Sequence, residues 1–325
     1  MDRNRKKNIV IFGSGAIGCH LAYCLSHKEN NIYLISRNKN YEQIKKNGLI
    51  IEIKNNSKLI KKKKLLNGKD FFIYKSLAKI KTLEVDYLFV AVKLRDFTNK
   101  VSIKLAELIN CNTAIIPPCT NIPTWWSSML LSKKGIKLKK EKYLPINQTI
   151  GMTMWLSAAL SKPGHVVIRH VQRGYPLKAL NRKFVQKEKY LRDFISKRCK
   201  CPKVKNIFSE IFTKSINSLA FNLIAMKYKQ KNSELKKNPD AINDIIAIMR
   251  EGNDICSFFN LKLEQSIEER IRQTLKSSTH TMSMLSDFLK KRKSEMPFLW
   301  NSYEDLNKYT KIKMDKTEAV YKELF

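Results

Sequence analysis

Apolar residues in the first half of the chain gather in short runs that predict buried strands. The runs at 9–12, 86–92 and 113–116 are nearly uninterrupted and rich in β-branched and aromatic side chains. Strands that are buried on both faces of a parallel sheet have this pattern. Helical patterns at 16–25 and 187–197 lie between or beyond these runs. The alternation of strand and helix predicts an α/β fold with a parallel sheet.

The pattern changes beyond about residue 205, where apolar residues recur at intervals of three and four and glycine becomes rare. This spacing predicts long amphipathic helices. With 325 residues the chain is long enough for two domains, each with its own core. We therefore predict a parallel-sheet domain at 1–204 and an all-α domain at 205–325.

A glycine motif follows the first predicted strand directly. Gly13, Gly15 and Gly18 have G-x-G-x-x-G spacing, and a helical pattern begins at Ala16. In a dinucleotide-binding turn the first glycine makes the tight turn, the second admits the pyrophosphate, and the third lets the helix pack on the strand. The helix N-terminus then presents N–H groups to the phosphates. The motif predicts a Rossmann-type nucleotide-binding domain whose phosphate loop consists of Gly13, Ser14, Gly15, Ala16, Ile17 and Gly18.

A secretory signal is the alternative interpretation of this N-terminus, because basic residues precede the apolar run. The three glycines, His20 and the lack of a convincing cleavage site favour the nucleotide-binding interpretation.

The end of the second predicted strand, at 31–37, indicates the cofactor. NAD-specific sites place Asp or Glu there to bind the ribose 2′-hydroxyl, whereas this strand ends in Ser36 and Arg37. A guanidinium suits a 2′-phosphate, with Ser36 as a further donor, so we predict NADP(H). The alternative is a solvated arginine at a strand end. Lys93, which closes the 86–92 run, is predicted to meet the cofactor or substrate, or else to be an ordinary surface lysine.

The charge balance is strongly basic, with 63 Lys and Arg against 28 Asp and Glu and a net charge of +35. Such an excess attracts polyanions, but the lysines are spread along the whole chain, and the runs Lys61–Lys64 and Lys290–Lys293 are local. We therefore expect solvated lysine surfaces and no specific nucleic-acid partner.

Two other classes of protein are disfavoured by the sequence. No run approaches the roughly 20 apolar residues that span a bilayer, so no membrane partner is expected. The seven cysteines are scattered, and Cys199 and Cys201 lack a second pair at zinc-ligand spacing. We expect a cytoplasmic protein with reduced thiols and no metal site.

The predicted helical half contains one polar stripe. Lys214, Ser218 and Asn222 are spaced at four and lie on one face of a helix, while Ile216, Leu219, Ala220 and Leu223 supply apolar packing surface. By itself such a stripe is also typical of an ordinary solvated helix face.

Together these motifs resemble the ketopantoate reductase (2-dehydropantoate 2-reductase) family over nearly the whole chain. The family pattern has the glycine motif, an arginine after the second strand and a lysine closing a later strand, as in Gly13–Gly18, Arg37 and Lys93. It also has a lysine followed by asparagines four and eight residues later. Further matches are Asn232 in Asn-Ser-Glu-Leu, and Ser283 in Ser-Met-Leu-Ser-Asp with Glu295 twelve residues on.

The chain departs from the family pattern at two places. Ser218 replaces the first asparagine after Lys214. Thr120 and Asn121 stand where the family has Asn-Gly, so either Asn121 takes over the asparagine's role or this contact to nicotinamide and substrate has changed. Both departures bear on the identity of the substrate more than on the type of reaction.

The resemblance implies NADPH-dependent reduction of ketopantoate, with Lys214 and Glu295 as catalytic residues and Lys214 as the general acid. It implies cofactor contacts from Lys93, Thr120 and Asn121, and substrate contacts from Ser218, Asn222, Asn232 and Ser283. A turn, expected at 290–293, must separate Ser283 from Glu295 because a separation of twelve does not share a helix face. The partner is a small 2-oxo acid, and the protein is expected to be a monomer or homodimer.

Two alternatives stay open after the resemblance is named. One is an NADPH-dependent reductase of another 2-oxo acid on the same scaffold. The other is a degenerate, basic homologue without catalysis, against which the intact glycine motif, Lys214 and Glu295 speak.

Overall fold

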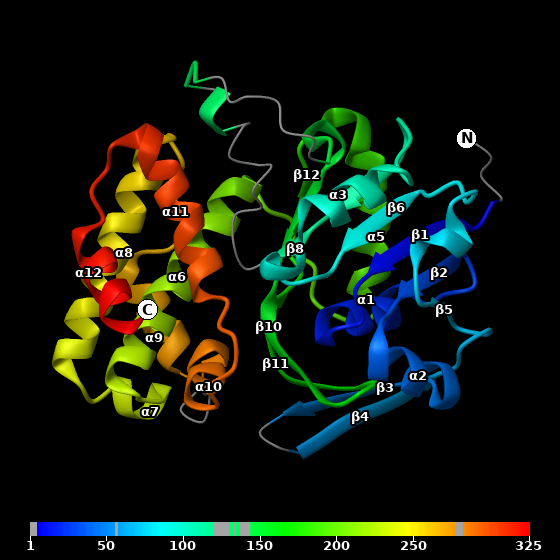
Figure 1. Cartoon of the computed structure of the whole chain (residues 1–325), viewed down its shortest axis with the longest axis horizontal. Coiled ribbons are helices and arrows are strands. Elements are labelled where there is room, and N and C mark those ends of the chain that lie inside the picture. The colour runs from blue at the N-terminus through cyan, green and yellow to red at the C-terminus, as the bar shows by residue number, and fades with distance from the viewer. Residues whose placement is uncertain (1–4, 56–57, 120–129, 133, 137–143, 277–281) are drawn as a thin grey trace. The chain divides into compact units, whose positions relative to one another are not determined.

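The computed structural model describes residues 5–55, 58–119, 130–132, 134–136, 144–276 and 282–325 (Figure 1). The described residues form two compact units. The N-terminal unit holds those up to Cys119 and those from 144 to Ile207. The helical unit holds those from Phe208 to the end, with the short stretches between 130 and 136. The assignment of cofactor binding to residues 1–204 and of substrate binding and catalysis to residues 205–325 stays a prediction.

A five-stranded sheet with the order β5-β2-β1-β6-β7 forms the centre of the N-terminal unit. Each of its pairings is parallel, which confirms the predicted α/β fold class. The central strand is fully enclosed, because Ile9, Val10 and Ile11 have no exposed surface. The strands are β1 (Lys7–Phe12), β2 (Asn30–Ile35), β5 (Phe72–Tyr74), β6 (Tyr87–Val90) and β7 (Ala114–Ile116).

Helices of the same unit follow the strands much as the apolar pattern predicts. The helix α1 (Ala16–Leu25) has the predicted bounds, and its last eight residues are buried. The others are α2 (Asn38–Asn47), α3 (Asn99–Ala106) and α5 (Val185–Ser196), with the 3₁₀ turns η1 (Leu77–Ile80), η2 (Leu94–Asp96), η3 (Ile146–Gln148) and η4 (Arg182–Phe184).

Two smaller sheets complete the N-terminal unit. A four-stranded mixed sheet has the order β10-β11-β3-β4, and a three-stranded one has the order β12-β9-β8. Their strands are β3 (Leu49–Asn55), β4 (Lys58–Leu65), β8 (Pro118–Cys119), β9 (Ile150–Thr153), β10 (Trp155–Lys162), β11 (His165–Gly174) and β12 (Leu177–Ala179). The lysine run at 61–64 is part of β4, an edge strand in which only Leu65 is buried. Sequence patterning missed this strand because it has no buried face.

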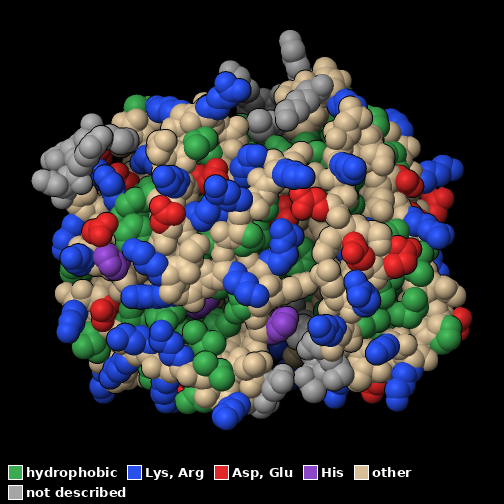
Figure 2. Space-filling view, turned by 180° about the vertical axis from the view of Figure 1, so that it is seen from behind, with side chains coloured by type: hydrophobic (Ala, Val, Ile, Leu, Met, Phe, Trp, Pro, Cys, Tyr) green, Lys and Arg blue, Asp and Glu red, His purple; other side chains and the backbone are tan. Residues whose placement is uncertain are grey.

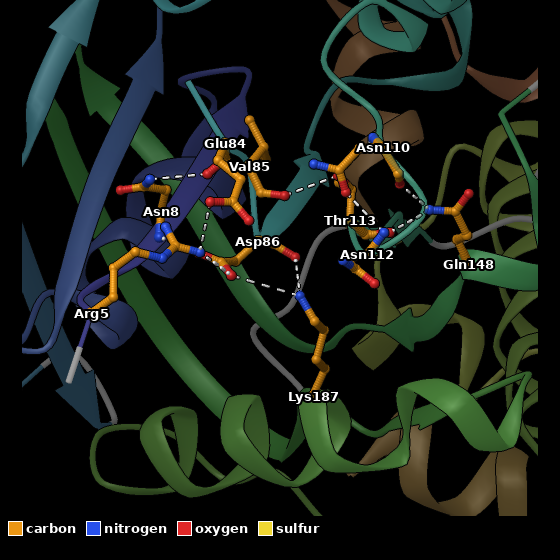
Figure 3. A network of polar contacts seen from close by, with 10 residues as sticks. All are labelled: Arg5, Asn8, Glu84, Val85, Asp86, Asn110, Asn112, Thr113, Gln148 and Lys187. Carbon is orange, nitrogen blue, oxygen red and sulfur yellow. Dashed lines mark hydrogen bonds and ion pairs between the residues drawn. The ribbon is translucent and has the colours of Figure 1, made fainter. Parts of the chain in front are cut away.

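A polar network fixes the amino ends of the central strands (Figure 3). Arg5 binds both carboxylate oxygens of Asp86 at 2.9 and 3.0 Å, and the backbone N–H of Asn8 donates to the same carboxylate at 2.9 Å. Lys187 on α5 donates to the Asp86 carbonyl at 3.1 Å. This network lies at the edge opposite to the carboxyl ends, where ligands of such sheets bind, so we assign it a structural role.

The helical unit packs around α6 (Ile207–Tyr228), whose residues Ile216, Leu219, Ala220 and Leu223 are fully buried as predicted. Gly252 on α8 allows a close approach to α6, because a Cβ there would lie 2.7 Å from Ile216 Cγ1. The remaining helices are α7 (Asn232–Leu235), α8 (Pro239–Phe258), α9 (Ile267–Leu275), α10 (Ser283–Leu289), α11 (Met296–Thr310) and α12 (Asp315–Leu324).

Lysine and arginine side chains are scattered over the face seen in Figure 2, with Asp and Glu between them. Within the described residues, no helix has the length and apolar character to span a membrane. The same residues contain no group of three or more His, Cys, Asp or Glu side chains suited to a metal ion.

Candidate active site

The glycine loop joins β1 to α1 at the carboxyl edge of the central sheet. Gly13 has φ +116°, a conformation that favours glycine, and a Cβ there would lie 2.5 Å from the Ala91 carbonyl oxygen. A Cβ on Gly18 would overlap the Gly13 carbonyl oxygen. These two glycines therefore permit the tight turn and the close packing of α1 that the motif predicts.

The second glycine of the motif, Gly15, leaves its surroundings open. Gly15 is the N-cap residue of α1, and a Cβ there would meet nothing within 4 Å. Among the described residues, no side chain caps this helix end. The N-terminal N–H groups and the positive end of the helix dipole can therefore receive an anion. This open, uncapped turn fits a cofactor pyrophosphate.

Hydrogen bonds hold the loop in place from neighbouring segments. The hydroxyls of Ser14 and Ser36 lie 2.5 Å apart, and Ser36 is only 1% exposed. Asn40 donates to the Ser14 carbonyl at 3.2 Å. The Ser36 hydroxyl thus ties the end of β2 to the glycine loop, and its predicted contact to a phosphate stays a prediction.

A cavity of about 560 Å³ opens beside the ends of β1 and β2. Phe12, Ile35 and Arg37 line it, and the Arg37 guanidinium lies 5.7 Å from the Phe12 ring centroid. Arg37 is exposed, so its donors can reach a ligand in the cavity. The other walls come from the segment after β5 and from α3, and consist of Lys75, Ser76, Leu77, Ala78, Lys81, Thr98, Lys100, Val101, Lys104 and Glu107.

Lys93 lies three residues after the end of β6 and is exposed. It follows Ala91 and Val92, the two residues that pack against Gly13. The structure thus places Lys93 at the carboxyl edge that holds the glycine loop. Two further residues predicted to contact the cofactor, Thr120 and Asn121, lie outside the described residues.

In the helical unit, Lys214 is a half-buried residue in the middle of α6. Desolvation lowers the pKa of this ammonium from 10.5 to about 8. A lysine with such a pKa is still mostly protonated at neutral pH but releases its proton more readily than a surface lysine. This is the property that a general acid needs.

Two neighbours of Lys214 on the predicted stripe are connected to each other. Asn222 is 4% exposed, and its Nδ2 donates to the Ser218 carbonyl at 2.7 Å. Its Oδ1 accepts from the backbone N–H of Met284 at 3.2 Å. Asn222 therefore links α6 to the first turn of α10, which begins at Ser283.

Asn232, the first residue of α7, is fully buried, and its Nδ2 donates to the Thr274 carbonyl at 3.0 Å. Asn217 donates to the Thr274 hydroxyl at 2.9 Å. The Oδ1 atoms of both asparagines are buried and accept no hydrogen bond from the residues that the structure describes. Sequence reasoning had not singled out Asn217, although it stands directly before Ser218.

Glu295 is half-buried and occupies the N-cap position of α11. The helix α10 ends at Leu289, and Lys291 has φ 49°. A break thus separates Ser283 from Glu295, which confirms the turn expected at 290–293.

The glycine turn, the uncapped helix and the cavity at the carboxyl edge define a nucleotide-binding α/β protein with an added helical unit. The two halves of the chain match two family models. Residues 9–118 match "Ketopantoate reductase PanE/ApbA" and residues 206–324 match "Ketopantoate reductase PanE/ApbA C terminal". The chain therefore belongs to the ketopantoate reductase family, a family of NAD(P)-dependent oxidoreductases.

Individual relatives agree with this assignment. A 2-dehydropantoate 2-reductase from Pyrococcus horikoshii is 26% identical over 297 residues, which is 90% of this chain and 87% of the relative. The structure of a 2-dehydropantoate 2-reductase from Geobacter metallireducens is similar, with a TM-score of 0.78, 17% identity and 98% coverage of both chains. A ternary structure of D-mandelate dehydrogenase with NADH and anilino(oxo)acetate has a TM-score of 0.77 and 19% identity, covering 98% of this chain and 96% of that one. At these identities the two structures show the shared fold.

Proposed function

We propose that this protein catalyses the NADPH-dependent reduction of 2-dehydropantoate (ketopantoate) to pantoate, the reaction that serves pantothenate and coenzyme A synthesis in the cytoplasm. Matches to the family in both halves of the chain support the proposal, as does the similarity to the 2-dehydropantoate 2-reductase of Pyrococcus horikoshii. The observation that carries it is the half-buried Lys214 of α6, whose lowered pKa suits proton transfer.

The N-terminal unit would hold the cofactor. The N–H groups at the start of α1 would bind the pyrophosphate, and the exposed Arg37 would bind the 2′-phosphate in the cavity beside β2. Lys93, Thr120 and Asn121 are the further proposed cofactor residues. The bound NADPH supplies the hydride for the reaction.

Lys214 would act on the carbonyl oxygen of the 2-oxo acid. As an ammonium it attracts the negative charge that develops on this oxygen, and it then transfers its proton from Nζ to the same atom. Burial makes this transfer easier because it weakens the hold of Nζ on the proton.

The other family positions would orient the substrate. We assign the carboxylate to Ser283 and a hydroxyl to the acceptor Glu295. Ser218, Asn222 and Asn232 would add further contacts. Asn222 and Asn232 hydrogen-bond to backbone groups of the same unit, so they would also act on the substrate through the positions of α10 and α9.

Steady-state kinetics test this function directly. The loss of NADPH should be followed with ketopantoate and with a panel of other 2-oxo acids, at matched concentrations. The proposal requires the highest kcat/KM for ketopantoate with NADPH. A protein that binds NADPH but reduces none of these acids would instead support the non-catalytic homologue.

A reductase of another 2-oxo acid is the second candidate. Ser218 shortens the side chain one turn after Lys214, and the fold is shared with a D-mandelate dehydrogenase. Phenylglyoxylate, the 2-oxo acid that corresponds to mandelate, therefore belongs in the panel. A kcat/KM for it above that for ketopantoate would favour this second function.

A further inference from the structure

Two cations stand at the ends of neighbouring strands in the N-terminal unit. The strands β2 and β5 are parallel, and their register pairs Ile35 with Tyr74. The backbone N–H of Ser36 also donates to the Tyr74 carbonyl at 3.0 Å. Arg37 follows β2 by two residues, and Lys75 follows β5 directly. The sheet thus brings both side chains to one carboxyl edge, and both line the 560 Å³ cavity.

The Lys75 ammonium is held by α2, which begins directly after Arg37. Its Nζ lies 2.8 Å from Glu42 Oε1 and 4.9 Å from the Tyr41 ring centroid. Both members of this ion pair are about two-thirds exposed, with 64% and 65% of their side-chain surfaces accessible. An exposed pair of this kind is weak and exchanges easily for a stronger anion. The carboxylate of Glu42 also keeps the pKa of Lys75 above its usual value.

We propose that Lys75 is a second cation for the 2′-phosphate of NADP(H), and that Glu42 holds its ammonium beside the cavity until the phosphate arrives. This inference rests on the proposed NADPH-dependent function and adds a specificity residue to it. The phosphate is close to a dianion at neutral pH, so one guanidinium leaves part of its charge unmatched. A lysine one strand away supplies the second charge.

The other cations of the cavity have different surroundings. Lys81 lies 2.8 Å from Glu107, which lines the same cavity. Lys100 and Lys104 line the cavity from α3 and do not follow a strand of the sheet. Lys75 is the cavity lysine that directly follows β5, the strand paired with β2, and we therefore assign the second phosphate contact to it.

Direct binding to the full-length protein tests the proposal without any turnover. Adenosine 2′,5′-bisphosphate and adenosine 5′-monophosphate serve as probes because they differ only in the 2′-phosphate. In isothermal titration, K75A should weaken binding of the bisphosphate by about fivefold and leave the monophosphate unchanged. E42Q should strengthen bisphosphate binding, since it removes a competing carboxylate that also repels the phosphate.

The matched control is K79A, which removes an exposed lysine four residues away that does not line the cavity. An unchanged bisphosphate affinity in K75A, with the parent still preferring the bisphosphate, would overturn the role of Lys75 and leave the cofactor proposal intact. An equal loss for both probes would also overturn it, because it would indicate a contact to the adenosine. A parent that binds both probes equally well would contradict NADP(H) itself and Lys75 with it.

Discussion

The side chain of Asn222 on α6 caps the start of α10 through Met284, which lies 62 residues further along the chain. Its Oδ1 accepts a hydrogen bond from the backbone N–H of Met284 at 3.2 Å, at the start of α10. The N-cap residue of α10, Met282, offers no side-chain acceptor of its own. Asn222 therefore satisfies one of the N–H groups that a helix start leaves unpaired, and it fixes the position of Ser283 relative to α6.

Removing this cap should destabilise the helical unit. N222L leaves the buried Met284 N–H without an acceptor, and we expect a loss of about 1–3 kcal/mol in the free energy of unfolding. Urea unfolding measures it. N222D is the companion variant because it keeps an acceptor for Met284 but cannot donate to Ser218. If N222L unfolded at the parental urea concentration, the remote cap would contribute nothing.

Arg37 should decide the choice between the two nicotinamide cofactors. We expect the parent to bind NADPH much more tightly than NADH, and R37A to lose most of this difference, about one to two decades of affinity. Fluorescence titration with each cofactor gives the two dissociation constants. Equal affinities in the parent would show that the exposed guanidinium beside Phe12 recognises no 2′-phosphate.

The stability of the N-terminal unit should depend on pH through His20. His20 is a buried residue of α1, its Nδ1 lies 2.8 Å from the Tyr175 hydroxyl, and burial lowers its pKa from 6.5 to about 4. Between these values the unfolded chain binds a proton that the folded chain does not. Stability is therefore complete above pH 6.5 and falls as the pH decreases toward 4, by about 2 kcal/mol at about pH 5.

H20Q tests this linkage because glutamine has no titrating group. As the pH is lowered from about 7 to about 5, the parent should lose more unfolding free energy than H20Q does. A difference that stays constant over this range would rule out His20 as the titrating group.

Sequence patterning predicted most of the elements that position the site, for identifiable reasons. The run at 9–12 is buried on both faces and therefore carries no polar residue, and the glycine spacing is imposed by backbone contacts around Gly13 and Gly18. The strand β4 was missed because an exposed edge strand with four successive lysines has no buried face to produce a pattern.

The hydrogen-bond partners of the site side chains could not be predicted from the sequence. Spacing by four correctly placed Asn222 near Ser218, but only the fold shows that its amide bonds to Met284. Ser36 was predicted as a further donor to a phosphate, which stays a prediction, and only the fold shows that its hydroxyl lies 2.5 Å from that of Ser14. The position of Lys75 immediately after a predicted strand could have marked it as a ligand contact. The pairing of that strand with β2, however, depends on the order of the strands in the sheet.

The pKa of Lys214 should appear in the pH dependence of catalysis. The proposed mechanism needs the protonated form for reduction, so kcat/KM should be level below about pH 8 and decline as the pH rises through that value. The reverse oxidation needs the neutral amine and should increase over the same interval. A reduction rate that stays level well above pH 8 would mean that the proton comes from a different group.

The central claim is that Lys214 is the proton donor, and single-turnover measurements on K214A test it most directly. With NADPH bound, K214A should reduce ketopantoate about 10²–10⁴-fold more slowly than the parent, while its NADPH dissociation constant changes little. K308A, which removes an exposed lysine of α11 outside the proposed site, serves as the control. Near-parental turnover by K214A on the best 2-oxo acid, with NADPH still bound, would contradict the account.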